Sequence, residues 1–457
     1  MKKVYLLFLC FILGQAIFAL EVVYPKKPVV MLNTPSTFFV GSSNPSKDLY
    51  INGTKVPVHP SGGFAYPVSL KIGENTFELK SGQDKLNYKI TRTYPKKTSV
   101  SSQKYIEYAN KKYGTVKTDL TPLRTEPVDG GINRLSHLQT GIPVEIYGEK
   151  NGFYKVKLTY DNFGWVMKNQ VNLSDKLVES VELKGCDFYG DEEYANFIFH
   201  LSGRTLWSIE ETSDKLSMKL YGIKGYKNEL LELDINTADT LQNKPIAGYN
   251  AYFNGNDFIL KIRKPMHISE RNPFKGVKIV LDPGHGGNEL GAIGCLGDKE
   301  KDINLKYVKD LAKKLKASGA EVVLTRDDDS FVSLQDRVIK TNSEDAFIFI
   351  SIHGNALPDT SNPLTVSGAE VYYYYNQAKP LADEIMQSFV QNAGMKNHGI
   401  YQRSFAVVRN SAALSILIEV GYLINPGDNA KIISDEFRKK AVDAIFDGIE
   451  NYLKSLI

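Results

Sequence analysis

The sequence predicts a multidomain protein in which N-terminal all-β modules precede a C-terminal α/β domain with an open sheet. The chain has 457 residues, more than one hydrophobic core usually holds. Up to about residue 265, short alternating apolar and polar runs between turn signals predict strands. From about residue 275 onward, apolar strands alternate with amphipathic helical stretches, which indicates a largely parallel sheet.

The N-terminal stretch predicts export from the cytoplasm. Two lysines precede an apolar run of about a dozen residues and then Ala19, which is typical of a secretory signal peptide over residues 1–19. A membrane anchor is the alternative, but the apolar run is short for a spanning helix. We therefore expect a mature protein in the periplasm or cell envelope, with no integral membrane span.

Composition, charge and cysteine content argue against nucleic-acid binding and against a disulfide framework. Hydrophobic residues make up 42% of the chain, and the net charge of +4 falls to +2 when the two lysines of residues 1–19 are removed. No basic block occurs, so we expect no nucleic-acid binding. Beyond the leader, Cys186 and Cys295 lie in different predicted modules without a CxxC neighbour, which argues against a disulfide framework.

Three β modules are predicted before the α/β domain. Residues 20–93 alternate between turns such as Asn52-Gly53 and resemble an immunoglobulin-like β-sandwich of bacterial surface proteins. A polar linker, residues 93–103, follows. Residues 112–174 and 178–265 form two further strand-rich modules. The stretches "YANFIFHLSG", "LSMKLYG" and "DFILKIRKP" of the latter resemble the β-modules that precede amidase domains in cell-wall enzymes.

The module at residues 112–174 resembles a bacterial SH3-like domain. Short strands, a glycine-rich turn and the pair Gly164-Trp165 carry the resemblance. Such modules often bind the cell wall, although a role as a spacer is the alternative. Trp165 and Tyr154 are candidates for a sugar or peptide platform, or for half-buried core aromatics.

The α/β domain, residues 275–457, begins with the continuous apolar strand 277–282, which predicts burial on both faces. Leu305, Val308, Leu311, Ala312 and Leu315 then form one helical stripe that ends at Gly319. Ser333 and Asp336 predict a capping box. Further strands are predicted at 320–326, 346–352, 368–375 and 415–420, with helices at 333–342 and 379–394 and two more at the end.

Four chemically active side chains fall at the ends of these elements. His285 and His353 follow strands, Glu419 ends a strand, and Glu300 begins the first long helix. Two histidines and a carboxylate are typical of a catalytic zinc site with an open position for water. Glycines around His285 allow the backbone to turn sharply, and Glu419 is then the candidate acid/base.

Each of these residues also has an ordinary interpretation. Glu300 alone is compatible with a helix-start charge, and Glu419 alone with a buried ion pair. The spacing of the histidines matches no short zinc motif. The remaining histidines are interpreted as core or surface residues: His59, His137, His200, His267 and His398.

The combination of motifs is more specific than any single residue. "IVLDPGHGG", "EKDINL", "VVLTR", "SLQDR", "FISIHGNA", "GAEVYYY" and "ILIEVGYLINP" occur in this order. Over about 277–455 they resemble the zinc-dependent N-acetylmuramoyl-L-alanine amidases of the amidase-3 type. Two departures are Gly354, where alanine is usual, and "SAALS", which lacks a frequent proline.

The resemblance implies a peptidoglycan hydrolase that cleaves the amide bond between N-acetylmuramic acid and L-alanine. It implies Zn²⁺ on His285, Glu300 and His353, with Glu419 as catalytic acid/base. A binding scaffold with a dead domain and a zinc peptidase of stem peptides are the alternatives. Some relatives carry an inhibitory helix after the strand 368–375. The short connections here leave no room for one, so we expect no obligate activator.

Overall fold

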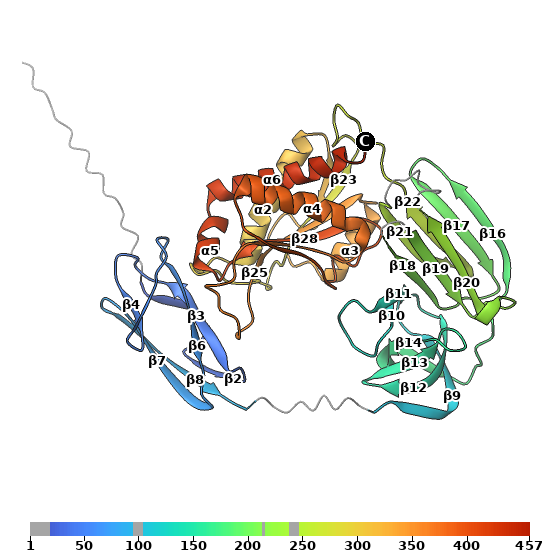
Figure 1. Ribbon diagram of the computed structural model, residues 1–457, viewed down its shortest axis with the longest axis horizontal. Coiled ribbons are helices and arrows are strands. Elements are labelled where there is room, and N and C mark those ends of the chain that lie inside the picture. Colours follow the sequence, from blue (N-terminus) through green and yellow to red (C-terminus); the bar gives the residue numbers. More distant parts are fainter. Residues whose placement is uncertain (1–18, 95–103, 213–214, 237–245) are drawn as a thin grey trace, which may run out of the picture.

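The computed structural model describes residues 19–94, 104–212, 215–236 and 246–457 (Figure 1). Residues 1–18 of the predicted leader and most of the linker at 93–103 lie outside these residues. In the described part, strands form six sheets, and the α-helices all lie beyond residue 299. The chain is thus mostly β in several sheets, as the multidomain prediction requires. None of the described helices has the length and apolar content needed to cross a bilayer.

Residues 19–94 form two sheets that pack face to face around Phe39, whose ring lies 5.2 Å from that of Phe77. The sheet orders are β1-β3-β6 and β2-β8-β7-β4-β5. This arrangement has the form of a sandwich, and its immunoglobulin-like identity stays a prediction. The strands are β1 (Glu21–Tyr24), β2 (Val29–Leu32), β3 (Ser36–Ser42), β4 (Leu49–Ile51), β5 (Thr54–Val56), β6 (Gly63–Ser69), β7 (Gly73–Ser81) and β8 (Asp84–Arg92).

The next unit is one seven-stranded antiparallel sheet of order β11-β10-β14-β13-β12-β9-β15. Tyr154 is buried in its core, whereas Trp165 is half-buried and its ring meets that of Tyr105 edge to face at 6.2 Å. The core interpretation therefore fits Tyr154. The strands are β9 (Ile106–Val116), β10 (Thr121–Arg124), β11 (Arg134–Leu138), β12 (Pro143–Lys150), β13 (Phe153–Lys157), β14 (Phe163–Met167) and β15 (Val171–Ser174).

The third unit has two sheets, β16-β17-β22-β21 and β18-β19-β20. Its apolar core is continuous with that of the second unit, and the Ser136 hydroxyl donates to the Trp207 carbonyl at 2.6 Å. The two units therefore pack against each other. The strands are β16 (Leu183–Gly190), β17 (Tyr194–Leu201), β18 (Trp207–Glu211), β19 (Lys215–Tyr221), β20 (Leu230–Asn236), β21 (Gly248–Asn254) and β22 (Asp257–Arg263).

The C-terminal unit is built on a six-stranded sheet of order β24-β23-β25-β28-β26-β27. The first four strands are parallel, β26 is antiparallel to β28, and β27 is parallel to β26. We did not anticipate β27, whose residues are only half-buried. The strands are β23 (Lys278–Pro283), β24 (Glu321–Leu324), β25 (Ile348–Asn355), β26 (Ala369–Tyr373), β27 (Asn397–Gln402) and β28 (Leu414–Tyr422).

Apolar helix faces cover one side of this sheet. The helices α2, α4 and α6 contribute to the same buried core as β23, β25 and β28. In α2, Ile303 and Tyr307 are buried, whereas Leu305, expected in the stripe, is only half-buried. The N-cap half of the predicted capping box is confirmed, since Ser333 Oγ accepts from the Asp336 N–H at 3.1 Å, whereas the Asp336 carboxylate accepts from the Ser333 hydroxyl at 2.7 Å. The helices are α2 (Glu300–Ala317), α3 (Leu334–Ser343), α4 (Lys379–Ser388), α5 (Pro426–Ile432) and α6 (Asp435–Lys454).

The C-terminal unit is flanked by β-sheet units on both sides (Figure 1). On one side, Tyr24 and Thr37 of the first unit donate hydrogen bonds to Asp359. On the other side, the third unit contacts the C-terminal unit through Tyr194, whose hydroxyl donates to Asp345 at 2.7 Å. The Tyr249 N–H also donates to the Ser411 carbonyl at 2.7 Å. The C-terminal unit is therefore held between the first and third units.

Candidate active site

His285 lies in a sharp turn directly after β23. Its φ angle is +61°, in the left-handed region, where a non-glycine residue is uncommon. The next residue, Gly286, has a φ of +139°. A Cβ at Gly284 would lie only 2.1 Å from Cε1 of His353. The glycines of this turn therefore allow the two imidazole rings to approach, and the ring centroids are 5.0 Å apart.

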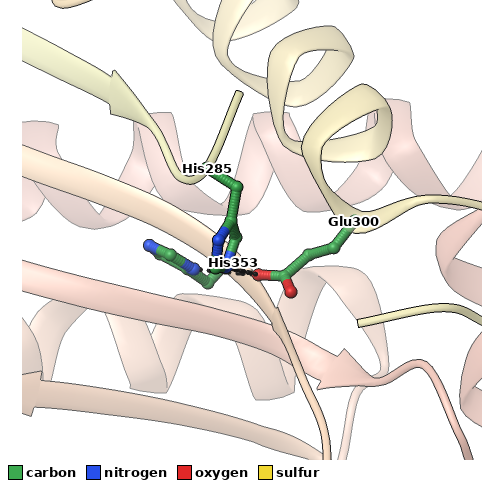
Figure 2. Close-up of side chains that lie close together, drawn as sticks. All are labelled: His285, Glu300 and His353. Atoms are coloured by element: carbon green, nitrogen blue, oxygen red, sulfur yellow. Dashed lines mark hydrogen bonds and ion pairs between the residues drawn. The ribbon is translucent and has the colours of Figure 1, made fainter. Parts of the chain in front are cut away.

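Glu300 is the first residue of α2 and is only 4% exposed. Its Oε2 atom accepts from the Ala292 N–H at 2.7 Å. Its Oε1 atom lies 2.8 Å from His353 Nδ1 and 3.1 Å from His285 Nε2. Figure 2 shows the three side chains converging from a loop, a helix start and a strand. One carboxylate oxygen thus contacts both imidazoles.

The geometry of these three groups fits a metal ion. One ligand atom from each of His285, Glu300 and His353 lies within 4.8 Å of the others. Zinc–ligand bonds of about 2.0–2.1 Å in a tetrahedron place the ligand atoms roughly 3.3 Å apart. The observed contacts of 2.8 and 3.1 Å are close to that separation. The set therefore needs only small shifts to surround a zinc ion.

Glu300 and the neighbouring histidines stabilise one another's charged forms. Burial alone would raise the pKa of the Glu300 carboxyl, but hydrogen bonds from His285 and His353 outweigh it and hold that pKa well below its usual range. Burial likewise opposes the charged form of His285, yet Glu300 raises its pKa overall. The carboxylate therefore stays ionised, as a metal ligand must.

Glu419 lies in the same row of the sheet as His353. In the register, His353 is opposite Glu419, and Glu419 is opposite Glu370 on the next strand. The Glu419 Oε2 atom is buried and has no hydrogen-bond partner among the described residues. Burial, and then the charges of Glu300 and Glu370, raise the pKa of Glu419 well above its usual range.

Glu370, by contrast, has several donors around it. The Asn355 amide donates to Oε2 at 2.7 Å, and the Tyr422 hydroxyl donates to Oε1 at 2.8 Å. The Tyr372 hydroxyl also donates to it, and His398 Nε2 lies 3.5 Å from Oε1. Two neighbouring carboxylates therefore have opposite surroundings. Glu370 is held by donors, whereas one oxygen of Glu419 has none.

The backbone around His285 is fixed by a buried ion pair below it. Arg337, on α3, pairs with Asp282 at the end of β23, and their side chains are 3% and 1% exposed. The same guanidinium donates to the carbonyls of Pro283 and His285, both at 2.9 Å. Asp282 also accepts from the Thr325 hydroxyl at 2.5 Å. This ion pair connects α3 directly to the turn that contains His285.

Some residues of this neighbourhood were not singled out from the sequence. Asp282, Arg326 and Arg337 lie within the quoted motifs, but their roles depend on pairing between distant elements. The Arg326 guanidinium, for example, donates to the Gly284 carbonyl at 2.9 Å. His398, interpreted as an ordinary histidine, lies beside Glu370. A histidine next to a buried acid leaves no periodic signal that could have identified it.

The other histidines are spread over the molecule. His59 contacts the Ser61 hydroxyl at 2.9 Å, and His267 is exposed. His200 lies between Asp187 and Asp257, at 3.1 and 2.9 Å. His137 lines a cavity that shares no lining residue with this site. Among described residues, Cys186 and Cys295 are both free thiols.

Comparison with known proteins places the site in a family. The family described as N-acetylmuramoyl-L-alanine amidase matches residues 279–451. The N-acetylmuramoyl-L-alanine amidase LytC of Bacillus subtilis is 40% identical over 188 residues, which are 40% of this chain and 37% of LytC. The uncharacterized protein YqiI of Bacillus subtilis is 37% identical over 184 residues, which are 39% of this chain and 86% of YqiI.

This chain therefore belongs to the N-acetylmuramoyl-L-alanine amidase family, and the matched residues form its C-terminal part, as the motifs predicted. It spans little more than a third of the length of LytC. Among solved structures, the N-acetylmuramoyl-L-alanine amidase AmiC2 of Nostoc punctiforme is 40% identical and covers 39% of this chain and 99% of its own, with a TM-score of 0.38.

Proposed function

We propose that this protein is an exported zinc-dependent N-acetylmuramoyl-L-alanine amidase that acts on peptidoglycan. The observation that carries the proposal is the convergence of His285, Glu300 and His353, with Glu419 directly opposite His353 on the neighbouring strand. Family membership supports the amide bond between N-acetylmuramic acid and L-alanine as the substrate bond. The predicted signal peptide supports a location in the periplasm or cell envelope.

His285, Glu300 and His353 would hold the zinc ion. When bound, zinc supplies Lewis acidity, which lowers the pKa of a bound water towards about 7 and polarises a carbonyl. Glu300 has a second function in this arrangement, because its oxygens also accept from the backbone N–H groups of Ala292 and Gly354, at 2.7 and 3.2 Å. These bonds fix the carboxylate between the two imidazoles.

Glu419 is the acid/base in this proposal. Its partnerless, buried oxygen is free to accept the proton of the attacking water and to pass it to the leaving nitrogen of L-alanine. Burial raises its pKa, which suits a group that must both take and return a proton. Glu370 does not compete for that proton, because its oxygens already accept from Asn355 and Tyr422.

The β units would hold the enzyme on the wall, and the SH3-like unit at 112–174 is the candidate for direct wall contact. Control by an activator is not needed in this proposal. In the described structure, residues 356–368 contain turns and no helix, so this connection brings no helical plug to the site. Export and wall binding would then limit where the enzyme acts.

Mass spectrometry of products from intact peptidoglycan tests the proposal. An amidase releases stem peptides that begin with a free L-alanine amine, together with glycan strands that keep the lactyl carboxylate. A zinc peptidase would instead release cut stems, and a scaffold with a dead domain would release nothing. The Glu419→Gln variant is the matched control, and products formed equally by it would contradict the assignment of the acid/base.

A further inference from the structure

A cavity of about 420 Å³ lies where three units of the molecule meet, and none of the residues that line it belongs to the candidate zinc site. The second unit contributes Arg134 and His137 of β11, and the third unit contributes Trp207 of β18. The C-terminal unit contributes one face of α3 and the segment around Arg409 and Asn410. The volume lies in the range of pockets that hold small-molecule ligands.

Unused hydrogen-bond donors line this cavity. Arg134 Nε, Trp207 Nε1 and Asn410 Nδ2 are all buried and have no partner among the described residues. Trp207 and Asn410 are 5% and 6% exposed. The orientation of the Asn410 amide is set by its Oδ1 atom, which accepts from the Ala412 N–H at 3.2 Å. Buried hydrogen-bond donors without acceptors are unfavourable. The cavity is therefore complementary to a ligand group that accepts hydrogen bonds and donates none.

The cavity also has an excess of positive charge. Arg134 and Arg409 line it, whereas none of its lining residues in the described chain is an aspartate or glutamate. Burial, and then the charges of Arg134, Arg409 and Arg124, lower the pKa of His137 to about 3. Among the described residues, Arg124 of this cluster pairs with Asp129, whose side chain is 62% exposed. Arg134 and Arg409, which face the cavity, form no ion pair with any acid in the described part of the chain.

The mouth of the cavity is apolar. Leu120 of the second unit and Leu334 and Ile339 of α3 line it, and these side chains are 55%, 60% and 52% exposed. Exposed leucine and isoleucine side chains beside a concave surface provide an apolar contact for a ligand. An occupant with an anionic head and an apolar body would satisfy both parts of the site.

We propose that this cavity binds a small amphipathic anion, with its oxyanion head on Arg134, Arg409, Trp207 Nε1 and Asn410 Nδ2. The apolar body of the ligand would lie along α3. Because the site is built from three units, the ligand would stabilise their observed arrangement by mass action. The opposite face of α3 carries Arg337, which holds the His285 turn, so this helix connects the two sites.

The test uses the full chain and four probes of the same length: octanoate, octyl phosphate, octanol and octyltrimethylammonium. Calorimetry and thermal melting should show binding and a raised melting temperature for one or both anions. Octanol and the cation should bind at least tenfold more weakly. Comparing octanoate with octyl phosphate shows whether the site prefers a carboxylate or a phosphate head group. Anions that bind no better than octanol would overturn the proposal.

Variants locate the binding. Arg134→Met should weaken the anion at least tenfold, whereas Arg403→Met, which alters an exposed arginine outside the cavity, should leave it unchanged. Leu334→Glu keeps the buried residues intact and places a negative charge at the mouth, so it should also weaken the anion. Leu334→Gln is its uncharged control. Unchanged affinity in both Arg134→Met and Leu334→Glu would place the ligand elsewhere and refute the site.

Discussion

Replacing Asp282 by asparagine removes one charge of the buried ion pair below the candidate metal site. The Asp282 and Arg337 side chains are 1% and 3% exposed, so Asp282→Asn leaves a buried guanidinium without its counter-ion. Breaking such a pair costs about 3–5 kcal/mol. For a unit of this size each kcal/mol lowers the melting temperature by about 2–4 °C. We therefore expect the C-terminal unit to melt roughly 6–20 °C lower.

The Asp282→Asn substitution should also weaken zinc binding. Arg337 donates to the His285 carbonyl at 2.9 Å, and that residue is held at a positive φ. Groups that orient metal ligands typically contribute 10- to 100-fold to metal affinity, so we expect zinc affinity to fall by about that factor. Calorimetric melting and a competitive zinc-chelator titration measure the two effects.

A matched control is Asp383→Asn in α4. Asp383 pairs with Lys379 but its side chain is 44% exposed, so the change should cost at most about 0.5 kcal/mol and leave zinc affinity unchanged. If Asp282→Asn melts within about 2 °C of the wild type and binds zinc equally well, the ion pair does not position His285 and the argument fails.

Three further predictions concern other parts of the molecule. Glu419→Gln should keep its zinc and its melting temperature but lose about 10²- to 10⁴-fold in turnover of peptidoglycan, and near wild-type turnover would remove Glu419 from the mechanism. Burial raises the pKa of Glu211 to about 7 against the opposing backbone donors. Its contribution to stability is therefore full below pH 4.5 and is lost as pH rises through 7. The melting temperature should fall between about pH 4.5 and 7, and Glu211→Gln should flatten that fall. Tyr24→Phe removes a hydrogen bond to Asp359 and should speed amide hydrogen exchange severalfold in the loop that carries Asp359. Tyr50→Phe, at an exposed tyrosine, is the control, and equal exchange in both variants would argue against docking of the first unit.

Much of the C-terminal unit follows from local sequence patterns. Continuous apolar runs identify β23, β25 and β28 because strands buried on both faces contain few polar residues. His285 and His353 then lie at the carboxyl ends of parallel strands, where ligand sites form. The structure brings both beside Glu300 for that reason. The positions of functional side chains at strand ends can therefore be predicted from a single sequence.

Contacts between elements that lie far apart in the sequence cannot be predicted in this way. The segment Asn397–Gln402 is polar and half-buried, so it carries no strand period, and its partner β26 is antiparallel to β28. The location of His137 beside the cavity could not be predicted either. The surroundings of His137 depend on how β11, β18 and α3 pack against one another. Local sequence patterns do not predict how separate units pack.

The zinc content per chain is the most direct test of the proposed metal site. We expect the purified protein to hold one zinc ion by elemental analysis, and His285→Ala and His353→Ala to lose most of it while remaining folded by circular dichroism. His398→Ala is the matched control, because this histidine also lies beside a buried carboxylate, 3.5 Å from Glu370, but outside the three-residue set. It should keep its zinc. Full zinc occupancy in both His285→Ala and His353→Ala would contradict the account.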